Sequence, residues 1–205
     1  ARRRRMKIFI ATKNEKKLKE IKRILEPLGF ETISEKDLRQ PLEEVEETGK
    51  TFEENALLKA EAGLKTTGLT TVADDSGLCV DCLGGKPGIY SARYSGSHGN
   101  DKANNEKLLN ELKNVKKEDR TAHFSCAVVC LFPDGRKISV TGKCEGYIDF
   151  APHGNHGFGY DPIFISEKGC FAELSDEQKD SISHRGRALK KFEEKIKEMI
   201  NGEKI

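Results

Sequence analysis

A short turn segment, Pro133-Asp134-Gly135, separates two long strand-like stretches at 120–132 and 137–148. Proline, aspartate and glycine each favour a tight turn, because proline restricts the backbone, aspartate hydrogen-bonds to nearby backbone groups and glycine tolerates a positive φ. The pattern therefore predicts a long antiparallel hairpin. This hairpin is the antiparallel part of the expected fold.

Strand-like and helix-like segments alternate before the hairpin. Strands are expected at 6–11, 30–34 and 69–73, and helices at 15–28, from about 51 to 65 and at 101–113. A short strand at 163–165 and a closing amphipathic helix from about 183 to 200 follow the hairpin, and the glycine-rich stretches 83–99 and 151–162 are expected to be loops. Such alternation favours an α/β fold with a mixed sheet.

Length and charge limit the class of protein. A chain of 205 residues with 36% hydrophobic and 34% charged residues can bury a core and fold as a soluble protein. Arg2–Arg5 supply four of the 36 basic residues; the remaining 32 face 34 acidic ones, so the rest of the chain has a net charge of −2. A body without a basic field argues against nucleic-acid binding.

The sequence also indicates the nature of the first five residues and the compartment of the protein. Residues 1–5 are interpreted as an N-terminal extension or expression remnant, and residues 6–205 as a single domain. No apolar run approaches the roughly 18 residues that span a bilayer. We therefore expect no membrane partner and a cytoplasmic location.

The six cysteines permit two interpretations. Cys79 and Cys82 have C-x2-C spacing and Cys126 and Cys130 have C-x3-C spacing, and paired cysteines can bind zinc. The flanking residues are strand-like, however, which puts Cys126 and Cys130 on one face. Buried, reduced thiols are the favoured interpretation.

Asp74 and Asp75, in the segment TVADDSGL, are adjacent carboxylates at the end of an apolar run. Successive side chains of a strand point to opposite faces, so both can face one cleft only if the strand has ended. We expect a tight turn built from Asp-Asp-Ser-Gly. A carboxylate at a strand end can in addition bind Mg²⁺ or take a proton from water.

Two further segments carry groups that can bind phosphate or metal. The segment TKNEKK at 12–17 follows the first strand and opens the first helix, where free N–H groups and the helix dipole attract phosphate. Its ordinary alternative is a helix cap followed by a solvated lysine face. The acidic run 43–47 can supply an oxygen ligand to a divalent cation, or it is an exposed loop.

Two segments near the C-terminus carry groups that can recognise a base. In 157–162 (GFGYDP), glycines surround Phe158, which can stack on a flat ligand or can anchor an ordinary loop. Lys179, His184 and Arg185 form a compact set of donors for an anion or a keto oxygen. Their ordinary alternative is a basic surface cluster.

Taken in order, the motifs TKNEKK, ETG, ADDSG, LGGKPGIYSARY, GFGYDP and KDSISHRG resemble those of the inosine/xanthosine triphosphate pyrophosphatase family, over residues 6 to about 200. These enzymes hydrolyse non-standard purine nucleoside triphosphates. The resemblance implies an elongated mixed β-sheet flanked by helices, with two lobes enclosing a central active-site cleft, and a homodimer. It also implies hydrolysis of ITP, dITP and XTP to the monophosphate and pyrophosphate, with Mg²⁺ as the cofactor.

The resemblance also assigns roles to individual residues. Glu47 and Asp75 match the family's magnesium ligands, and Asp75 matches its proton acceptor. The remaining matches are substrate contacts: Thr12, Lys13, Asn14, Glu15, Lys16, Lys17, Lys59, Ser76, Phe158, Gly159, Tyr160, Asp161, Lys179, Ser183, His184 and Arg185.

Other functions stay open at this level. A related triphosphatase for pyrimidine or modified nucleotides would keep the metal site and alter the base pocket. A nucleotide-binding regulator without turnover is a second alternative, although every acidic candidate is retained. An RNA-binding module is a third, and the net charge of the body argues against it.

Overall fold

A computed structural model describes residues 5–202, so most of the predicted N-terminal extension lies outside the described part. The described residues form two compact units. Unit 1 contains residues 5–75, 127–142 and 185–202, and unit 2 contains residues 76–126 and 143–184. No helix within residues 5–202 is both long and apolar enough to cross a membrane.

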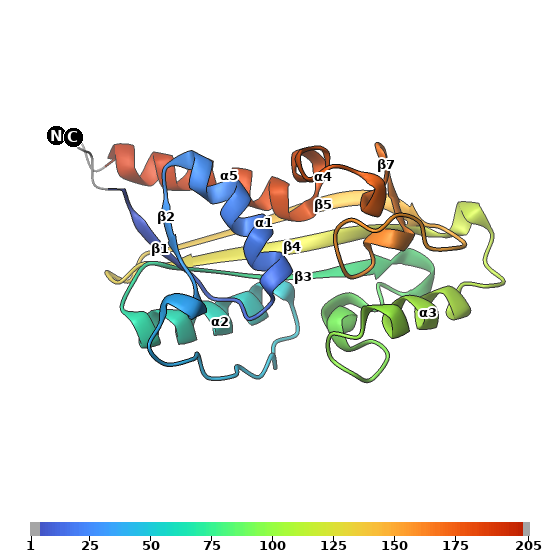
Figure 1. Cartoon of the computed structure of the whole chain (residues 1–205), viewed down its shortest axis with the longest axis horizontal. Helices are drawn as coiled ribbons and strands as arrows, with labels where there is room; N and C mark the ends of the chain where they lie inside the picture. The colour runs from blue at the N-terminus through green and yellow to red at the C-terminus, as the bar shows by residue number, and fades with distance from the viewer. Residues whose placement is uncertain (1–4, 203–205) are drawn as a thin grey trace. The chain divides into compact units, whose positions relative to one another are not determined.

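Seven strands form one mixed sheet in the order β2-β1-β3-β4-β5-β6-β7 (Figure 1). The strands are β1 (Lys7–Ile10), β2 (Glu31–Ile33), β3 (Thr71–Val80), β4 (Thr121–Leu131), β5 (Lys137–Ile148), β6 (Phe164–Ser166) and β7 (Gly169–Cys170). β1 pairs in parallel with β2 and β3, whereas β6 is antiparallel to β5 and β7. The predicted α/β class, with a mixed sheet flanked by helices, is confirmed.

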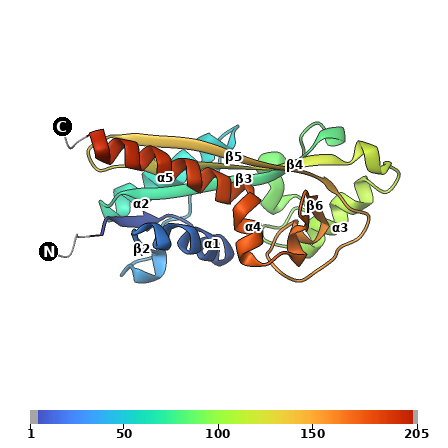
Figure 2. The same ribbon diagram turned by 90° about the horizontal axis from the view of Figure 1, so that it is seen from above.

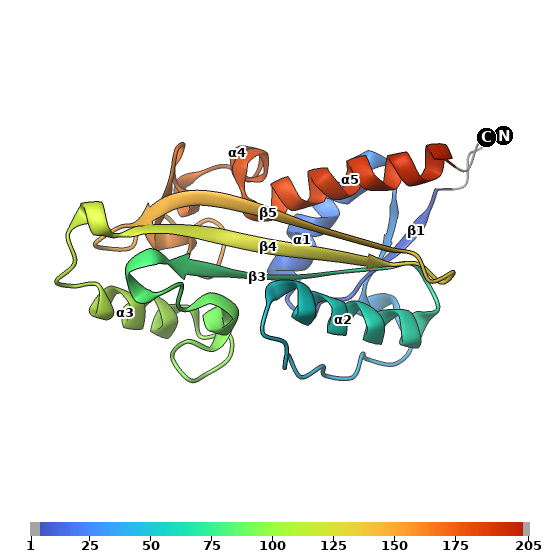
Figure 3. The same cartoon turned by 180° about the vertical axis from the view of Figure 1, so that it is seen from behind.

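The helices of unit 1 cover both faces of its strands. α1 (Glu15–Leu25) and α5 (His184–Gly202) lie on one side and α2 (Phe52–Thr67) on the other (Figures 1 and 3). Figure 2 shows α5 running alongside β5, where Lys191 Nζ donates to Thr141 O at 2.6 Å. Unit 1 therefore buries its strands between two helical layers, as the apolar residues of β1 require.

The contact between α2 and the strands depends on a glycine. A Cβ atom at Gly63 would lie 2.6 Å from Thr71 Cγ2 and 3.0 Å from Ala11 Cβ. Only a residue without a side chain allows the helix backbone to come this close. The close approach fixes the position of α2 over β1 and β3, including Lys59 one turn before Gly63.

Unit 2 has its own core around an aromatic cluster. The rings of Phe124 and Phe164 are 4.6 Å apart and those of Phe164 and Phe171 are 4.9 Å apart. The unit also contains α3 (Asp101–Glu111) and α4 (Asp176–Ile182), on opposite sides of its strands (Figure 3). The buried Arg120 donates to carbonyl oxygens of Leu112 and Asp149, which connects the region after α3 to the end of β5.

Several sequence-based predictions of local structure are confirmed and others are wrong. The hairpin is present as β4 and β5, but the expected tight turn at Asp74-Asp75 is absent, because β3 continues to Val80. β7 was not predicted. The closing helix predicted from about 183 to 200 is present as α5, α4 before it was not predicted, and the predicted loop 83–99 contains 3₁₀ turns.

The cysteines largely follow the favoured interpretation. All six are free thiols, and those at 126, 130, 144 and 170 are buried. Cys79 is half-buried and Cys82 is exposed, so burial was wrongly predicted for Cys82.

Candidate active site

The alternation of β3 separates the two adjacent carboxylates. Asp74 and Asp75 are 2% and 5% exposed, and they follow each other in an extended strand. Their side chains therefore point to opposite faces of the sheet. Asp75 meets Lys59 of α2, whereas Asp74 meets Lys17 of α1 and Arg185 of α5.

On the α2 side, two carboxylates share one ammonium group. Lys59 Nζ lies 3.0 Å from Glu47 Oε1 and 3.6 Å from Asp75 Oδ1. Burial opposes the charge of Lys59, but the carboxylates of Asp74, Asp75 and Glu47 outweigh it and raise the lysine's pKa. Glu47 and Asp75 therefore both contact the ammonium group of Lys59, which lies between their carboxylates.

Asp75 itself ionises with difficulty. Burial raises its pKa, the ammonium groups of Lys59 and Lys17 lower it, and the carboxylates of Glu47 and Asp74 raise it again, giving a value of about 6. Its second oxygen, Oδ2, is buried and has no hydrogen-bond partner among residues 5–202. A buried carboxylate oxygen without a partner is costly, which is typical of an atom that binds something during function.

Glu47 lies in a segment without regular secondary structure, and the start of α2 holds that segment in place. Asn55, a buried residue of α2, accepts a hydrogen bond from Gly49 N at 2.8 Å. A Cβ atom at Gly49 would lie 2.7 Å from the same oxygen, Asn55 Oδ1. Thr51 caps α2 by accepting from Glu54 N at 3.1 Å. The Thr-Gly step after Glu47 is therefore needed for this close approach to α2.

On the opposite face, Asp74 belongs to a buried group of charges. Its Oδ2 lies 3.5 Å from Lys17 Nζ and 3.3 Å from Arg185 Nη2, and Arg185 Nη1 donates to Glu20. Burial would raise the pKa of Asp74, but the positive charges of Lys17, Arg185 and Lys59 hold it well below its usual range. Asp74 is therefore an ionised structural partner, in contrast to its neighbour.

Sequence reasoning missed Glu20. It lies one turn after Lys17 and is buried, although its neighbours on α1 gave no reason to single it out. A glutamate buried in a helix requires a cationic partner, which here comes from α5, 165 residues further along the chain. A local pattern contains no signal for such a pairing.

The start of α1 is capped as the ordinary interpretation predicts. Asn14 Oδ1 accepts from Lys16 N and Lys17 N, each at 3.1 Å, and Thr12 Oγ1 accepts from Asn14 N. These bonds already engage the N–H groups of residues 14, 16 and 17. Phosphate binding here would have to rely more on side chains, above all Lys17, than on those N–H groups.

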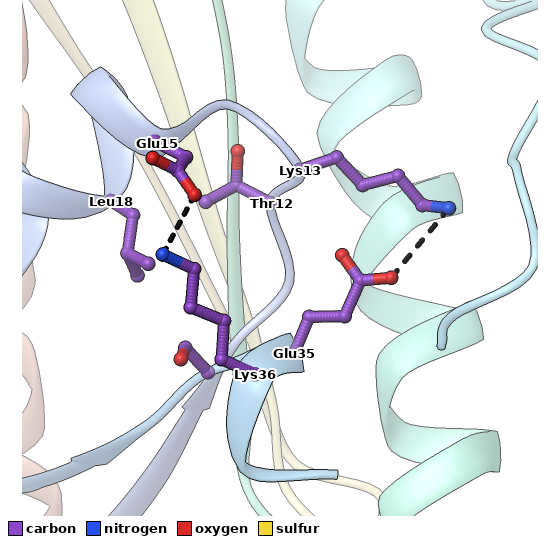
Figure 4. A pocket seen from close by; sticks show the side chains of 7 residues that line it. Thr12, Lys13, Glu15, Leu18, Glu35 and Lys36 are labelled. Atoms are coloured by element: carbon purple, nitrogen blue, oxygen red, sulfur yellow. Dashed lines mark ion pairs between the residues drawn. The ribbon is translucent and has the colours of Figure 1, made fainter. Parts of the chain in front are cut away.

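Other residues of the 12–17 segment line a small hollow against the 3₁₀ turn at 35–37. In Figure 4, Lys13 points toward Glu35 and Glu15 toward Lys36, with ion-pair distances of 3.7 Å and 2.7 Å. The Lys36 pairing lowers the pKa of the exposed Glu15 carboxyl, through its hydrogen bond first and its charge second. These two pairs tie the segment to the chain after β2.

The predicted base-recognition segment forms a compact loop in unit 2. Asp161 Oδ2 accepts from Phe158 N at 3.1 Å and from Lys179 Nζ at 2.6 Å, and Lys179 Nζ lies 4.9 Å from the centre of the Phe158 ring. Tyr160 is buried and its hydroxyl donates to Ser91 O at 2.6 Å. Phe158, Asp161 and Lys179 are thus brought together.

The remaining predicted contacts are in different surroundings. His184 is buried against the aromatic cluster of unit 2, with its ring 4.6 Å from that of Phe124. Ser183 is buried at the end of α4, where its N–H donates to Lys179 O, and Ser76 follows Asp75 on β3. Arg185, at 1% exposure, contacts Asp74 and Glu20 in unit 1.

Known proteins resemble this chain over most of its length. A dITP/XTP pyrophosphatase of Bacillus licheniformis is 52% identical over 187 residues, which cover 90% of this chain and 95% of the relative. The solved structure of the Staphylococcus aureus Ham1 protein matches with a TM-score of 0.81 at 44% identity, covering 97% of this chain and all of that one. A HAM1 protein from Coxiella burnetii matches with a TM-score of 0.83 at 36% identity over 94% and 99% of the two chains.

The profile of one protein family matches most of the sequence. Residues 8–195 match the Ham1 family, a range that includes Glu47, Asp75, the loop around Phe158 and the first part of α5. This range agrees with the resemblance drawn from the motifs, whose first segment begins at Thr12. By sequence and by structure, the chain belongs to the Ham1 family.

Proposed function

We propose that this protein hydrolyses non-standard purine nucleoside triphosphates, ITP, dITP and XTP, to the monophosphate and pyrophosphate. Membership of the Ham1 family supports the proposal, as does the relative from Bacillus licheniformis, whose name describes a dITP/XTP pyrophosphatase. In this reaction a water oxygen bonds to the α-phosphorus, the bond to the bridging oxygen breaks, and pyrophosphate leaves.

The observation that carries the proposal is the shared contact of Glu47 and Asp75 with Lys59. Both carboxylates lie within 3.6 Å of one ammonium group, although they come from segments far apart in sequence. The two carboxylates can bind a positively charged ion, and the ammonium group of Lys59 beside them can bind phosphate.

The same residues fit a divalent cation, and we assign Mg²⁺. Magnesium is commonly held by one or two carboxylates together with substrate phosphates. Glu47 and Asp75 would be the protein's contribution, because both carboxylates lie within 3.6 Å of Lys59 Nζ; within residues 5–202 no three His, Cys, Asp or Glu side chains cluster as a metal site. The unpartnered Oδ2 of Asp75 is suited to the role. When bound, the cation would stabilise negative charge on the phosphate oxygens.

Asp75 is assigned as the proton acceptor. A general base is most effective when its pKa lies near the working pH, and burial places that of Asp75 at about 6. The water's proton passes to the Asp75 carboxylate as the oxygen attacks. Lys17 and Lys59 are assigned to the phosphates, where their charge opposes the negative charge that develops on the departing pyrophosphate.

Recognition of the base is assigned to the segment 157–161 together with Lys179, Ser183, His184 and Arg185. Phe158 would stack on the purine. Donors such as Lys179 suit the C6 keto oxygen of hypoxanthine or xanthine, whereas adenine presents an amino group to the same donor. A site that leaves a buried donor unpaired rejects the wrong ligand by about 10⁴-fold or more.

The test is pyrophosphate release across a nucleotide panel. We expect ITP, dITP and XTP to be hydrolysed far faster than ATP or GTP, and Glu47→Gln to remove most of the activity. Glu46→Gln is the matched control, because Glu46 is another member of the same acidic run and contacts neither Lys59 nor Asp75 among the ion pairs of residues 5–202. Equal rates on ATP and ITP would contradict the specificity, and faster hydrolysis of UTP would favour the pyrimidine alternative. Tight binding without turnover would favour a regulator.

The proposal also includes a homodimer, which the family resemblance implies, and the cytoplasmic location expected from the sequence. Light scattering during gel filtration should give twice the mass of 22.9 kDa. A mass of one chain at micromolar concentration would refute the dimer and leave the catalytic proposal unaffected.

A further inference from the structure

Helix α3 holds both backbone groups of Gly159. Asp101 Oδ2 accepts from Gly159 N at 2.9 Å, and Asn105 Nδ2 donates to Gly159 O at 3.1 Å. Asp101 and Asn105 are four residues apart in α3, so their side chains lie on the same face of the helix. One helix face therefore grips the N–H and the C=O of a single residue more than fifty positions away.

Gly159 belongs to a loop whose two glycines adopt left-handed backbone conformations. Gly157 and Gly159 have φ values of +69° and +61°, a region that other residues rarely adopt. A Cβ atom at Gly157 would lie 2.0 Å from Asp161 Oδ2. Glycines lose more conformational freedom on folding than other residues, so the loop needs hydrogen bonds from outside to stay in one conformation.

Phe158 lies between these two glycines, and its backbone is fixed on both sides. Its N–H donates to Asp161 Oδ2 at 3.1 Å, and its C=O accepts from Asp161 N at 3.1 Å. The next peptide N–H is the one that Asp101 accepts. The position of the Phe158 ring therefore depends on α3 as well as on Asp161.

The same helix also holds a second loop. Asn104 Oδ1 accepts from Ser95 N at 2.8 Å, and Asn104 Nδ2 donates to Ala92 O at 3.2 Å. The Tyr160 hydroxyl in turn donates to Ser91 O. α3 thus supports the 157–161 loop directly and the 91–95 segment beside it, and Asp101 and Asn105 are its direct contacts with Gly159.

We propose that Asp101 and Asn105 are positioning residues for base recognition, which act by holding the Gly159 peptide and, through it, the Phe158 ring. The inference rests on the proposed function, in which Phe158 stacks on the purine. It adds two residues of α3 that contact no reacting atom. Their loss should weaken selection of the base and leave the chemistry at the phosphate largely intact.

Asn105 provides an isosteric test, because the orientation of its amide is fixed. Its NH₂ must face the Gly159 carbonyl oxygen, and its Oδ1 is buried with no hydrogen-bond partner within residues 5–202. Asn105→Asp keeps the shape but replaces the donor with an oxygen that repels the carbonyl. Asn110→Asp, the same change at a position of α3 away from the loop, is the matched control.

Asp101 provides an independent pair of variants. Asp101→Ala removes the acceptor for Gly159 N, whereas Asp101→Asn retains an oxygen that can accept the same bond. We expect Asp101→Asn to stay close to wild type and Asp101→Ala to resemble Asn105→Asp. This comparison keeps the inference testable if Asn105→Asp impairs folding.

The measurement is kcat and KM for ITP and for UTP, with thermal unfolding as a check on folding. For Asn105→Asp and Asp101→Ala we expect KM for ITP to rise about tenfold, the effect of one partly buried hydrogen bond lost, with little change in kcat. KM for UTP should change less, because a pyrimidine gains less from stacking on Phe158. The ratio of kcat/KM for ITP to that for UTP should therefore fall. Asn110→Asp should leave both values unchanged.

The outcomes separate this inference from the proposed function. An equal loss of activity on both nucleotides would indicate a merely structural role and would overturn the inference, as would an unchanged ratio in folded variants. If the wild-type protein released no pyrophosphate from ITP or XTP, the proposed function would fail first and this inference with it.

Discussion

Replacing Asp75 with asparagine should make the protein more stable while it removes catalysis. The carboxyl has an ordinary pKa of 3.8, and its burial raises the pKa to about 6 in the folded protein. Ionising this group in the fold therefore costs about 3 kcal/mol above pH 6, at about 1.36 kcal/mol for each tenfold change. Asparagine has nearly the same shape and carries no charge, so it avoids that cost.

The expected increase in the free energy of unfolding is smaller than this cost of ionising Asp75. The pKa of about 6 already includes the attraction of Lys59, but the amide would place an NH₂ donor at the position of the buried Oδ2, which has no hydrogen-bond partner within residues 5–202, and an unpaired buried donor is costly. We therefore expect Asp75→Asn to raise the free energy of unfolding by about 1–3 kcal/mol at pH 7.5. Activity should fall by about 10²-fold or more, since the proton acceptor is lost.

The sign of the pH dependence follows from the same shift. Between about pH 4 and pH 6 the folded wild-type protein binds more protons at Asp75 than the unfolded chain does, so its free energy of unfolding falls as the pH rises. The amide that replaces this carboxyl in the variant cannot titrate. The stability difference between the variant and the wild type should be near zero at pH 4 and reach its full value above pH 6.

Urea unfolding followed by circular dichroism, in chelator, measures this difference; the chain has no tryptophan for fluorescence. Asp74→Asn is the control on the opposite face of β3. It leaves the buried charges of Lys17 and Arg185 without their shared carboxylate, and removal of one partner from a buried pair costs about 3–5 kcal/mol. The reasoning would be refuted if Asp75→Asn were less stable than wild type at pH 7.5. A stability difference between the two proteins that does not change with pH would also refute it.

Three further changes test other contacts by urea unfolding. Arg120→Met removes the donor to several carbonyl oxygens, including the partly buried one of Asp149, and we expect a loss of about 2–4 kcal/mol; a neutral variant would show that water replaces the guanidinium. Gly63→Ala puts a methyl group 2.6 Å from Thr71 Cγ2, and such overpacking costs about 1–3 kcal/mol. Adding Thr71→Ser, which deletes that methyl, should restore most of the loss, and no recovery would contradict the contact. Gly159→Ala should cost about 1–2 kcal/mol because φ is +61° there, and it should also raise KM for ITP.

The parts of the fold that depend on local pattern could be predicted from the sequence. The hairpin was recognisable from its turn residues, and α1 from its spacing and from Asn14, which caps it. The end of β3 was predicted wrongly because aspartate disfavours strands. Here Lys17 and Lys59, from two helices, supply opposite charges that let the strand continue past Asp74 and Asp75.

The contacts of the candidate site were less accessible to sequence reasoning. Pairing of Glu20 with Arg185 spans 165 residues and that of Asp101 with Gly159 spans 58, and neither leaves a local pattern. Motifs identified Glu47 and Asp75 but gave no sign that one lysine contacts both. Long-range electrostatic partners are set by the packing of helices on the sheet, which a single sequence does not specify.

The uninterrupted path of β3 makes the spacing along this strand as important as the residues themselves. Phe9 pairs with Thr71 and Ile10 with Val72, which fixes where each later side chain of β3 emerges. A deletion or insertion of one residue between Val72 and Asp74 would exchange the two sides, and Asp75 would then face Arg185 while Asp74 faced Glu47. Length variation during evolution should therefore be confined to the turns that flank this strand.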